Sequence, residues 1–412
     1  MDYFEYRGGE LWAEEVRVKE LAERFGTPLY VYSKKTLERH FKAFDTALGE
    51  LDHLTCFSVK ANSNVSILRL LGGLGAGVDI VSGGELHRAL TAGIDPRKIV
   101  FSGVGKQTHE IREALRADIL MFNVESAQEL ERIGRIATEM NTLARISIRI
   151  NPDVDPKTHP YISTGLKKNK FGLDMLEATG AYLLAKETPS VEPVGMDCHI
   201  GSQLTQIGPF VEALKKLLAF ADRLQSSGVD IRYLDLGGGL GITYNEESPP
   251  LPAELGQVIA GTIGGRRLTV ILEPGRAIAG NAGILVTQVL YTKKTSAKNF
   301  VIVDAAMNDL IRPSLYGAYH RIGEINPKDR EKKVVDVVGP ICESSDFLAQ
   351  DRQLPTVEPG EYLAVFSAGA YGFTMSSQYN SRPRAAEVIV DGDRATPARR
   401  RESYADLIAL EI

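Results

Sequence analysis

The chain is poor in cysteine and carries little excess charge of either sign. Three cysteines occur in 412 residues, Cys56, Cys198 and Cys342, an odd number without metal-ligand spacing. There are 48 Lys and Arg against 53 Asp and Glu, so the formal net charge is −5. Nucleic-acid and anionic-membrane surfaces both need a basic excess, which this composition lacks. We therefore expect a protein of the reducing cytoplasm, with no nucleic-acid partner and no bound metal.

Long apolar runs and a leader segment are also missing. No uninterrupted apolar stretch approaches the ~18–20 residues of a transmembrane helix. The N-terminal "MDYFEYRGGELWAEEV" lacks a basic region followed by an apolar one, which is the signature of a secretory signal. The sequence thus predicts neither secretion nor a membrane partner.

Short apolar, β-branched runs alternate with longer helical patterns over the first two thirds of the chain. There are eight such runs: 53–59, 77–82, 98–103, 119–124, 144–150, 194–201, 231–239 and 268–275. Continuously apolar strands are typical of a parallel sheet that is buried on both faces. Eight strand–helix units in succession predict an α/β fold, a (β/α)8 barrel over residues 36–280.

The pattern changes after residue 280. Strand-like runs follow one another there with turns between them and little helix, which predicts a mostly antiparallel β domain over residues 281–412. The first 35 residues also contain a strand-like piece, "LYVYS" (29–33), and we expect them to join that domain.

Polar residues follow or end six of the eight predicted barrel strands. Barrel enzymes place their chemistry at the carboxyl ends of the strands. Lys60 follows the first run, where a solvated loop lysine is the ordinary alternative to an amine held in a pocket. The other residues at this rim are Asp79, Ser82, Arg149, His199, Ser202, Gly237, Gly238, Gly239, Glu273 and Arg276. Their convergence favours the pocket.

Two motifs in this group suggest a cofactor. A tight turn is the ordinary alternative interpretation of "GGGLG" (237–241), and the motif misses the dinucleotide fingerprint because Ile242 stands where that fingerprint needs glycine. Glycines after the seventh strand do match the common phosphate position of barrels. "EPGR" (273–276) offers a carboxylate that could also form a plain ion pair with its arginine. An amine, a phosphate cradle and a carboxylate on one rim match pyridoxal 5′-phosphate.

The motifs "SVKAN", "HIGSQ", "GGGLG" and "EPGR", in this order and spacing, resemble the alanine-racemase-like (fold type III) pyridoxal-phosphate enzymes and, within them, the diaminopimelate decarboxylase family. The resemblance covers nearly the whole chain. It implies Lys60 as the Schiff-base lysine, His199 stacked on the ring, the glycines on the phosphate and Glu273 on the pyridine nitrogen. It also implies a cofactor site that includes Asp79, Ser82, Arg149, Ser202, Gly275, Arg276 and Tyr371.

Further segments resemble parts of the same family. "HPYISTGLKKNKFG" (159–172) resembles the family's specificity segment, and "RPSLYGAYH" (312–320) resembles the segment that binds a substrate carboxylate. "CESSD" (342–346) resembles the segment that a neighbouring subunit inserts into the site, and "GAYGFTMSSQYNSRPR" (369–384) resembles a segment near the cofactor. The implied substrate-binding residues are Arg276, Arg312, Tyr316, Glu343 and Tyr371, and the implied catalytic residues are Lys60, Cys342 and His199.

The implied reaction is decarboxylation of meso-2,6-diaminopimelate to L-lysine and carbon dioxide, in a homodimer with shared sites. Cys342 or Lys60 would return the proton. The alternatives are a decarboxylase of the same fold acting on ornithine or arginine, a non-catalytic binding relative, and a racemase. A diamine-forming enzyme needs no grip on a distal carboxylate, so Arg276 and Arg312 argue against the first. A non-catalytic binding relative would be marked by loss of the Schiff-base lysine, and Lys60 is present. The carboxylate Glu273 favours decarboxylation over racemisation, since a racemase uses a weaker electron sink.

Overall fold

The computed structural model describes residues 2–155 and 169–412, and their contacts group them into two units. The barrel unit contains His40–Ile242 and Ser248–Ala277. The β unit contains Met1–Arg39, Thr243–Glu247 and Ile278–Ile412. The domain boundaries expected near residues 35 and 280 stay a prediction, because grouping by contacts does not test independent folding.

Eight parallel strands close into a barrel in the barrel unit, and each lies mostly or wholly within one of the predicted apolar runs. Around the ring they pair in chain order, and the last strand pairs with the first. They are β5 (His53–Ser58), β6 (Gly77–Ile80), β7 (Ile99–Phe101), β8 (Met121–Val124), β9 (Ala144–Arg149), β10 (Val191–Asp197), β11 (Tyr233–Asp235) and β12 (Thr269–Leu272). The predicted (β/α)8 barrel is confirmed.

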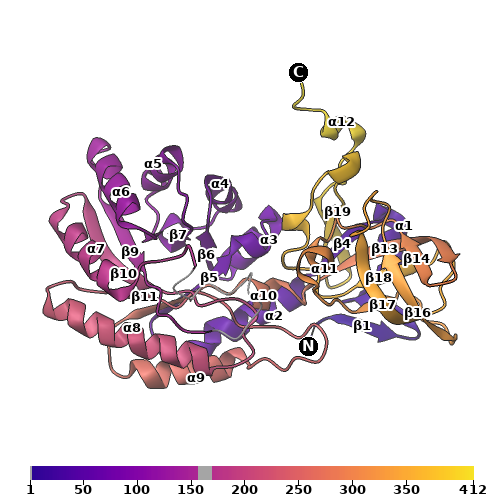
Figure 1. Ribbon diagram of the computed structural model, residues 1–412, viewed down its shortest axis with the longest axis horizontal. Coiled ribbons are helices and arrows are strands. Elements are labelled where there is room, and N and C mark those ends of the chain that lie inside the picture. The colour runs from indigo at the N-terminus through magenta and orange to yellow at the C-terminus, as the bar shows by residue number, and fades with distance from the viewer. Residues whose placement is uncertain (1, 156–168) are drawn as a thin grey trace. The chain divides into compact units, whose positions relative to one another are not determined.

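Helices follow the strands and cover the outside of the ring, as Figure 1 shows for α4 to α9. They are α3 (Val65–Gly73), α4 (Gly83–Ala92), α5 (Thr108–Ala117), α6 (Ala127–Glu139), α7 (Met175–Glu187), α8 (Gly208–Ser226), α9 (Pro252–Ile263) and α10 (Arg276–Ala279), with α2 (Lys34–Asp45) before β5. The short 3-10 turns η1 (Thr46–Leu48), η2 (Val59–Ala61) and η3 (Pro96–Lys98) complete the connections. Asn64, Ser82 and Ser126 cap α3, α4 and α6 by accepting backbone N–H bonds.

The β unit is built on a nine-stranded sheet that is mostly antiparallel, as predicted. Its path is β17-β16-β14-β13-β4-β19-β20, and β18 pairs with both β13 and β15. The strands are β4 (Leu29–Ser33), β13 (Gly283–Lys294), β14 (Asn299–Val303), β15 (Ile322–Glu324), β16 (Lys332–Val338), β17 (Phe347–Pro355), β18 (Tyr362–Val365), β19 (Ala386–Asp391) and β20 (Arg394–Arg399). The pairs β14–β16 and β4–β19 are parallel.

The early strand β4 runs through the middle of this sheet, where Figure 1 shows it among strands from the end of the chain. All five of its residues are buried, and Leu29 and Val31 pack with Ile284 and Val388 in the core. A small sheet of β1 (Phe4–Arg7), β2 (Glu10–Ala13) and β3 (Val16–Arg17) and the helices α1 (Val18–Phe25), α11 (Arg312–Tyr316) and α12 (Tyr404–Leu407) belong to the same unit, with the 3-10 turns η5 (Phe373–Met375) and η6 (Tyr379–Ser381). None of the helices in the described residues is long and apolar enough to cross a membrane.

Candidate active site

Lys60 lies in the 3-10 turn η2, directly after β5, at the carboxyl end of the barrel. Its Nζ donates to Asp79 Oδ2 on the neighbouring strand β6 at 2.5 Å. The lysine side chain is 35% exposed, whereas the Asp79 carboxylate is fully buried. A freely solvated loop lysine has no fixed position. The Lys60 amine is instead held in place by one carboxylate, while part of the lysine side chain remains exposed.

Asp79 holds this amine through a buried carboxylate. Its Oδ2 also accepts a hydrogen bond from Ser58 Oγ at 2.6 Å. Burial alone would raise the pKa of Asp79, but the charge of Lys60 and the hydrogen bonds from Lys60 and Ser58 outweigh it, so this pKa lies below its ordinary value. Asp79 is therefore an ionised anchor for the lysine at neutral pH.

More buried polar side chains lie in the barrel than the sequence analysis identified. We call Lys60, Asp79, Ser102, Asn123, Glu125, Arg149, Asp197, Asp235 and Glu273 the barrel cluster. Asn123 Nδ2 lies 3.1 Å from Ser102 Oγ and 3.2 Å from Asp235 Oδ2, and Ser102 Oγ lies 3.5 Å from Glu273 Oε1. Ser102, Asn123, Glu125, Asp197 and Asp235 were missed. The sequence feature that could have identified them is a single polar residue at or next to the end of an apolar strand run, as in "MFNV" and "YLD".

The barrel cluster contains more acid than base. Arg149 Nη1 donates to Glu125 Oε1 at 2.9 Å, and its Nε lies 3.8 Å from Asp197 Oδ2. Burial, followed by repulsion from neighbouring carboxylates, raises the pKa of Glu273 and of Asp197 well above their usual range. Burial likewise raises the pKa of Asp235. Five carboxyl groups thus share the cluster with two cationic side chains, and a further positive charge beside them would favour their ionised forms.

The glycine loop after β11 packs too closely for any side chain. A Cβ on Gly238 would lie 2.2 Å from the carbonyl oxygen of Glu273, and one on Gly239 would lie 2.4 Å from that of Gly201. Gly237 has φ +64° and donates its N–H to Asp235 Oδ1 at 2.9 Å. After β12, a Cβ on Gly275 would contact Ser58 and Ala61 at 2.9 Å. These glycines keep the backbone of neighbouring strand ends in contact.

His199 follows β10 and contacts this glycine loop. Its Nδ1 lies 3.1 Å from the backbone N of Gly238, which can only donate, so the ring proton belongs on Nε2. Burial and the nearby positive charges of Arg149 and Lys60 lower the pKa of His199 to about 3. The imidazole is therefore neutral at physiological pH. A neutral ring suits the stacking contact that the resemblance implies, and it does not suit a general acid.

Three further predicted residues lie around this rim. Ser82 is the N-cap of α4 and accepts from the backbone N of Glu85 at 3.2 Å, so part of its role is to start that helix. Arg276 is buried and lies 3.3–3.4 Å from Ser202 Oγ through Nη2 and Nε. The structure thus brings the predicted barrel residues to one end of the ring. Residues 159–168 of the predicted specificity segment lie outside the described part of the chain.

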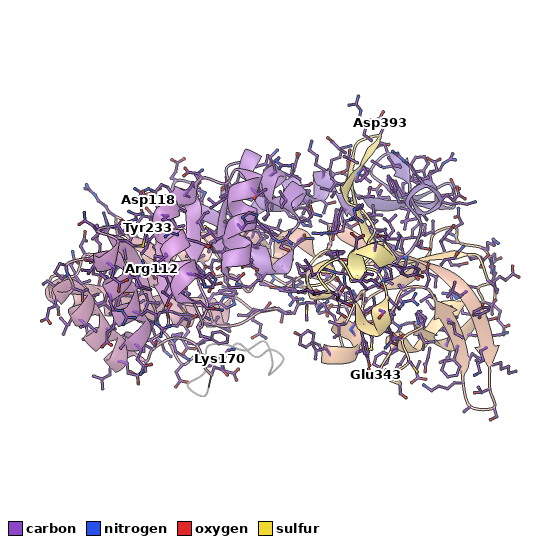
Figure 2. All side chains as sticks on the ribbon, turned by 90° about the horizontal axis from the view of Figure 1, so that it is seen from above. Arg112, Asp118, Lys170, Tyr233, Glu343 and Asp393 are labelled. Carbon is purple, nitrogen blue, oxygen red and sulfur yellow. The ribbon has the colours of Figure 1, made fainter. Side chains whose placement is uncertain are left out.

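The remaining predicted residues belong to the β unit. Arg312 begins α11 and is buried, and Tyr316 ends that helix half-buried. Cys342 is exposed, and its backbone N donates to Asn380 Oδ1 at 2.8 Å. Glu343 is an exposed acid at the edge of this unit in Figure 2, and it accepts from Tyr379 Oη at 2.7 Å. Tyr371 has φ +56°, a strained backbone of the kind that clusters at functional sites.

Comparisons with known proteins agree over the whole chain. Residues 34–280 match the family model of the pyridoxal-dependent decarboxylase, pyridoxal binding domain. The diaminopimelate decarboxylases of Pseudomonas aeruginosa and Vibrio cholerae are each 55% identical to the chain, over all of it and 99% of their own length. The structure of diaminopimelate decarboxylase from Helicobacter pylori complexed with L-lysine is 48% identical, with a TM-score of 0.93 over 96% of this chain and 99% of that one.

The barrel residues fit pyridoxal phosphate. Lys60 is a partly exposed amine, the glycine loop after β11 lies at the barrel end where phosphates commonly bind, and the carboxyl groups around Glu273 suit a protonated ring nitrogen. Buried acceptors also remain unsatisfied within the described residues, among them Asp79 Oδ1 and Asp197 Oδ1. Since buried polar atoms are nearly always paired, these acceptors are consistent with a bound ligand or water.

The glycine loop yields a direct test. Gly238→Ala should abolish cofactor uptake, because its Cβ would force the loop away from Glu273. Gly261→Ala on α9, where nothing lies within 4 Å, is the matched control and should bind normally. Visible absorbance of the bound cofactor measures the result. A Gly238→Ala protein with the wild-type cofactor content would contradict the packing described here.

The neutral His199, which is half-buried, makes stability depend on pH. Because its pKa is about 3 when folded and about 6.5 when unfolded, the unfolded chain binds a proton first as the pH falls. Between pH 7.5 and 5.5 this group alone lowers the unfolding free energy of the wild type by about 1 kcal/mol. Urea unfolding of cofactor-free His199→Asn should lack that loss, while His87→Asn, on the exposed face of α4, should keep it. An equal loss in wild type and His199→Asn would refute the assignment.

Proposed function

The chain belongs to the pyridoxal-dependent decarboxylases, and within them to the diaminopimelate decarboxylase family, and from this premise we propose that it converts meso-2,6-diaminopimelate to L-lysine and carbon dioxide. One observation carries the proposal: the half-exposed amine of Lys60, anchored by Asp79, at the barrel end that also holds the glycine loop and Glu273. It is a pyridoxal-phosphate-dependent enzyme, and the relative solved with L-lysine has the same fold.

Different barrel residues would bind different parts of the cofactor. Bound through an imine, pyridoxal phosphate supplies a ring that accepts the electron pair left behind when carbon dioxide departs. Lys60 is the residue that would hold it covalently. The loop Gly237–Gly239 would lie against its phosphate, with Ser202 and Arg276 beside it, while the N–H groups of Gly237 and Gly238 stay bonded to Asp235 and His199. Glu273 would carry the charge opposite the ring nitrogen, and neutral His199 would stack on the ring face. Ser82, Arg149, Gly275 and Tyr371 complete the proposed cofactor site.

Residues of the β unit, and Arg276 of the barrel unit, would bind the end of the substrate that does not react. Diaminopimelate carries a second amine and a second carboxylate there. Arg276, Arg312, Tyr316 and Tyr371 suit the carboxylate, because a guanidinium can bind it through two hydrogen bonds. The exposed acid Glu343 suits the ammonium. An ornithine-like substrate lacks the distal carboxylate and would leave buried arginines unpaired, so a polar site of this kind rejects it strongly.

The proton returned to carbon would come from Cys342 or from Lys60. Cys342 is exposed in the chain described here, which is expected of a residue that a symmetric partner would use. We therefore propose a homodimer in which each subunit completes the other's site with its "CESSD" segment. A reducing, cytoplasmic setting is part of the proposal and is supported by Cys56, Cys198 and Cys342 all being free thiols.

Product analysis tests the reaction. Wild-type protein should release equal amounts of carbon dioxide and lysine from meso-diaminopimelate. Lys60→Ala should lose activity by several powers of ten, because no other group can replace the covalent amine. Lys215→Ala, an exposed lysine on α8, should behave as wild type. Borohydride should bleach the visible absorbance by fixing the cofactor to Lys60. Preference for ornithine, or a modified lysine elsewhere, would refute the assignment.

Mixed dimers test the shared site. The inactive variants Lys60→Ala and Cys342→Ala should regain activity when they are mixed under conditions that let subunits exchange. Each mixed dimer would hold one intact site and one site that lacks both residues. Random exchange of equal amounts leaves roughly a quarter of all sites intact. If exchange is verified by mass and activity stays at the level of the separate variants, each chain uses its own Cys342.

A further inference from the structure

His320, which no catalytic assignment above includes, is fully buried in the β unit and bonded through both ring nitrogens. Its Nδ1 lies 2.8 Å from the carbonyl oxygen of Phe366, and its Nε2 lies 2.8 Å from Arg312 Nη1. A carbonyl oxygen only accepts, so Nδ1 carries the proton. A guanidinium only donates, so Nε2 must be unprotonated and accept. Both contacts together require the neutral Nδ1–H tautomer.

Backbone hydrogen bonds of the neighbouring strands fix the position of this imidazole. The strand β15 begins two residues after His320 and pairs with β18, with Ile322 opposite Val365. The ladder continues through the backbone N of Phe366, which donates to the carbonyl oxygen of Arg321 at 2.8 Å. Arg352 Nη1 also donates to the carbonyl oxygen of His320 at 2.8 Å. The histidine and its Phe366 acceptor are therefore set by strand register, and the ring has little freedom to turn.

Tyr244 restrains the same guanidinium from a second side. The Cζ of Arg312 lies 4.7 Å from the centroid of the Tyr244 ring, within the range of a cation–π contact. The rings of Tyr244 and His320 meet edge to face, with centroids 5.3 Å apart and planes at 79°. Arg312 is thus buried against one aromatic face and one imidazole nitrogen.

We propose that His320 is a positioning residue for substrate recognition, acting through Arg312. The inference rests on the proposed function, in which Arg312 binds the distal carboxylate of diaminopimelate. An aspartate or glutamate at position 320 would hold the guanidinium by charge and would compete with the substrate carboxylate for it. A neutral imidazole acceptor aims the guanidinium without adding a competing negative charge. The expected effect of losing this acceptor is weaker binding of substrates that carry a distal carboxylate.

Two amide substitutions separate the two ring nitrogens. In His320→Asn the amide nitrogen takes the place of Nδ1 and keeps the bond to Phe366, but the acceptor for Arg312 is lost. In His320→Gln an amide oxygen reaches the place of Nε2 and keeps that acceptor. His320→Asn should raise KM for meso-diaminopimelate roughly tenfold or more, with a smaller change in kcat, since it loosens a charged hydrogen bond. His320→Gln should stay within about threefold of wild type for the same reason.

A ligand without the distal carboxylate provides the specificity readout. D-Lysine keeps the reacting D-centre and the distal amine, and its inhibition constant should be the same in wild type, His320→Asn and His320→Gln. The double variant Arg312→Ala/His320→Asn should be no worse than Arg312→Ala, because a residue that acts through Arg312 has nothing to position without it. Additive effects, or equal losses for D-lysine and diaminopimelate, would show a merely structural role and overturn the inference.

The remaining outcomes are also decisive. If wild type decarboxylates diaminopimelate but His320→Asn keeps its KM, the inference fails and the proposed function stands. If Arg312→Ala leaves KM unchanged, the role of both residues is refuted while the decarboxylase assignment survives. If wild type does not act on diaminopimelate, the proposed function fails, and the inference fails with it. If His320→Asn does not fold, as judged by thermal unfolding and cofactor absorbance, the test uses His320→Gln instead. A KM of His320→Gln that is raised as far as the KM of Arg312→Ala overturns the inference.

Discussion

The pairing of β12 with β5 closes the eight parallel strands, and the rest of the candidate site depends on that closure. In a closed parallel barrel all strands end at the same rim, so residues more than two hundred positions apart become neighbours. Lys60 after β5, Asp79 on β6, the glycines after β11 and Glu273 after β12 meet for this reason. The tight contact between Gly238 and the carbonyl of Glu273 is a further consequence, because adjacent strand ends must pack without an intervening side chain.

The barrel interior carries an electrostatic cost that a structural core would avoid. Buried carboxyl groups at Asp197, Asp235 and Glu273 repel one another, and burial already raises their pKa values. Replacing such groups by apolar residues of similar size is often neutral or stabilising in other proteins. Their presence around Lys60 is therefore best explained by function, since a positively charged ring nitrogen offsets the acid excess.

The β unit uses a different device to control charge. Arg312 is buried beside the aromatic ring of Tyr244 and donates to the neutral nitrogen of His320. The barrel cluster thus presents a surplus of carboxyl groups, and the β unit presents the buried guanidinium of Arg312.

Much of this protein was readable from local pattern. The eight barrel strands, the antiparallel strands after residue 280 and the position of Lys60 follow from short apolar runs and from the residue that ends each run. The motifs around Lys60, His199, the glycine loop and Glu273 were also sufficient for the family and the cofactor, because each is contiguous in the chain. The segment 29–33 could be identified as a strand, although its neighbours could not.

Contacts between distant side chains were decided only by the tertiary structure. The segments "MFNV" and "YLD" do not indicate that Asn123 and Asp235 share a hydrogen bond, since 112 positions separate these two residues. The motif "RPSLYGAYH" includes both Arg312 and His320, yet their contact depends on strand register with Phe366, and Tyr244 joins them from a loop that carries no motif. Sequence determines which residues can form an element and what chemistry they carry. Which of them touch, and hence which nitrogen of a histidine holds the proton, is set by the packing of elements that are remote in the chain.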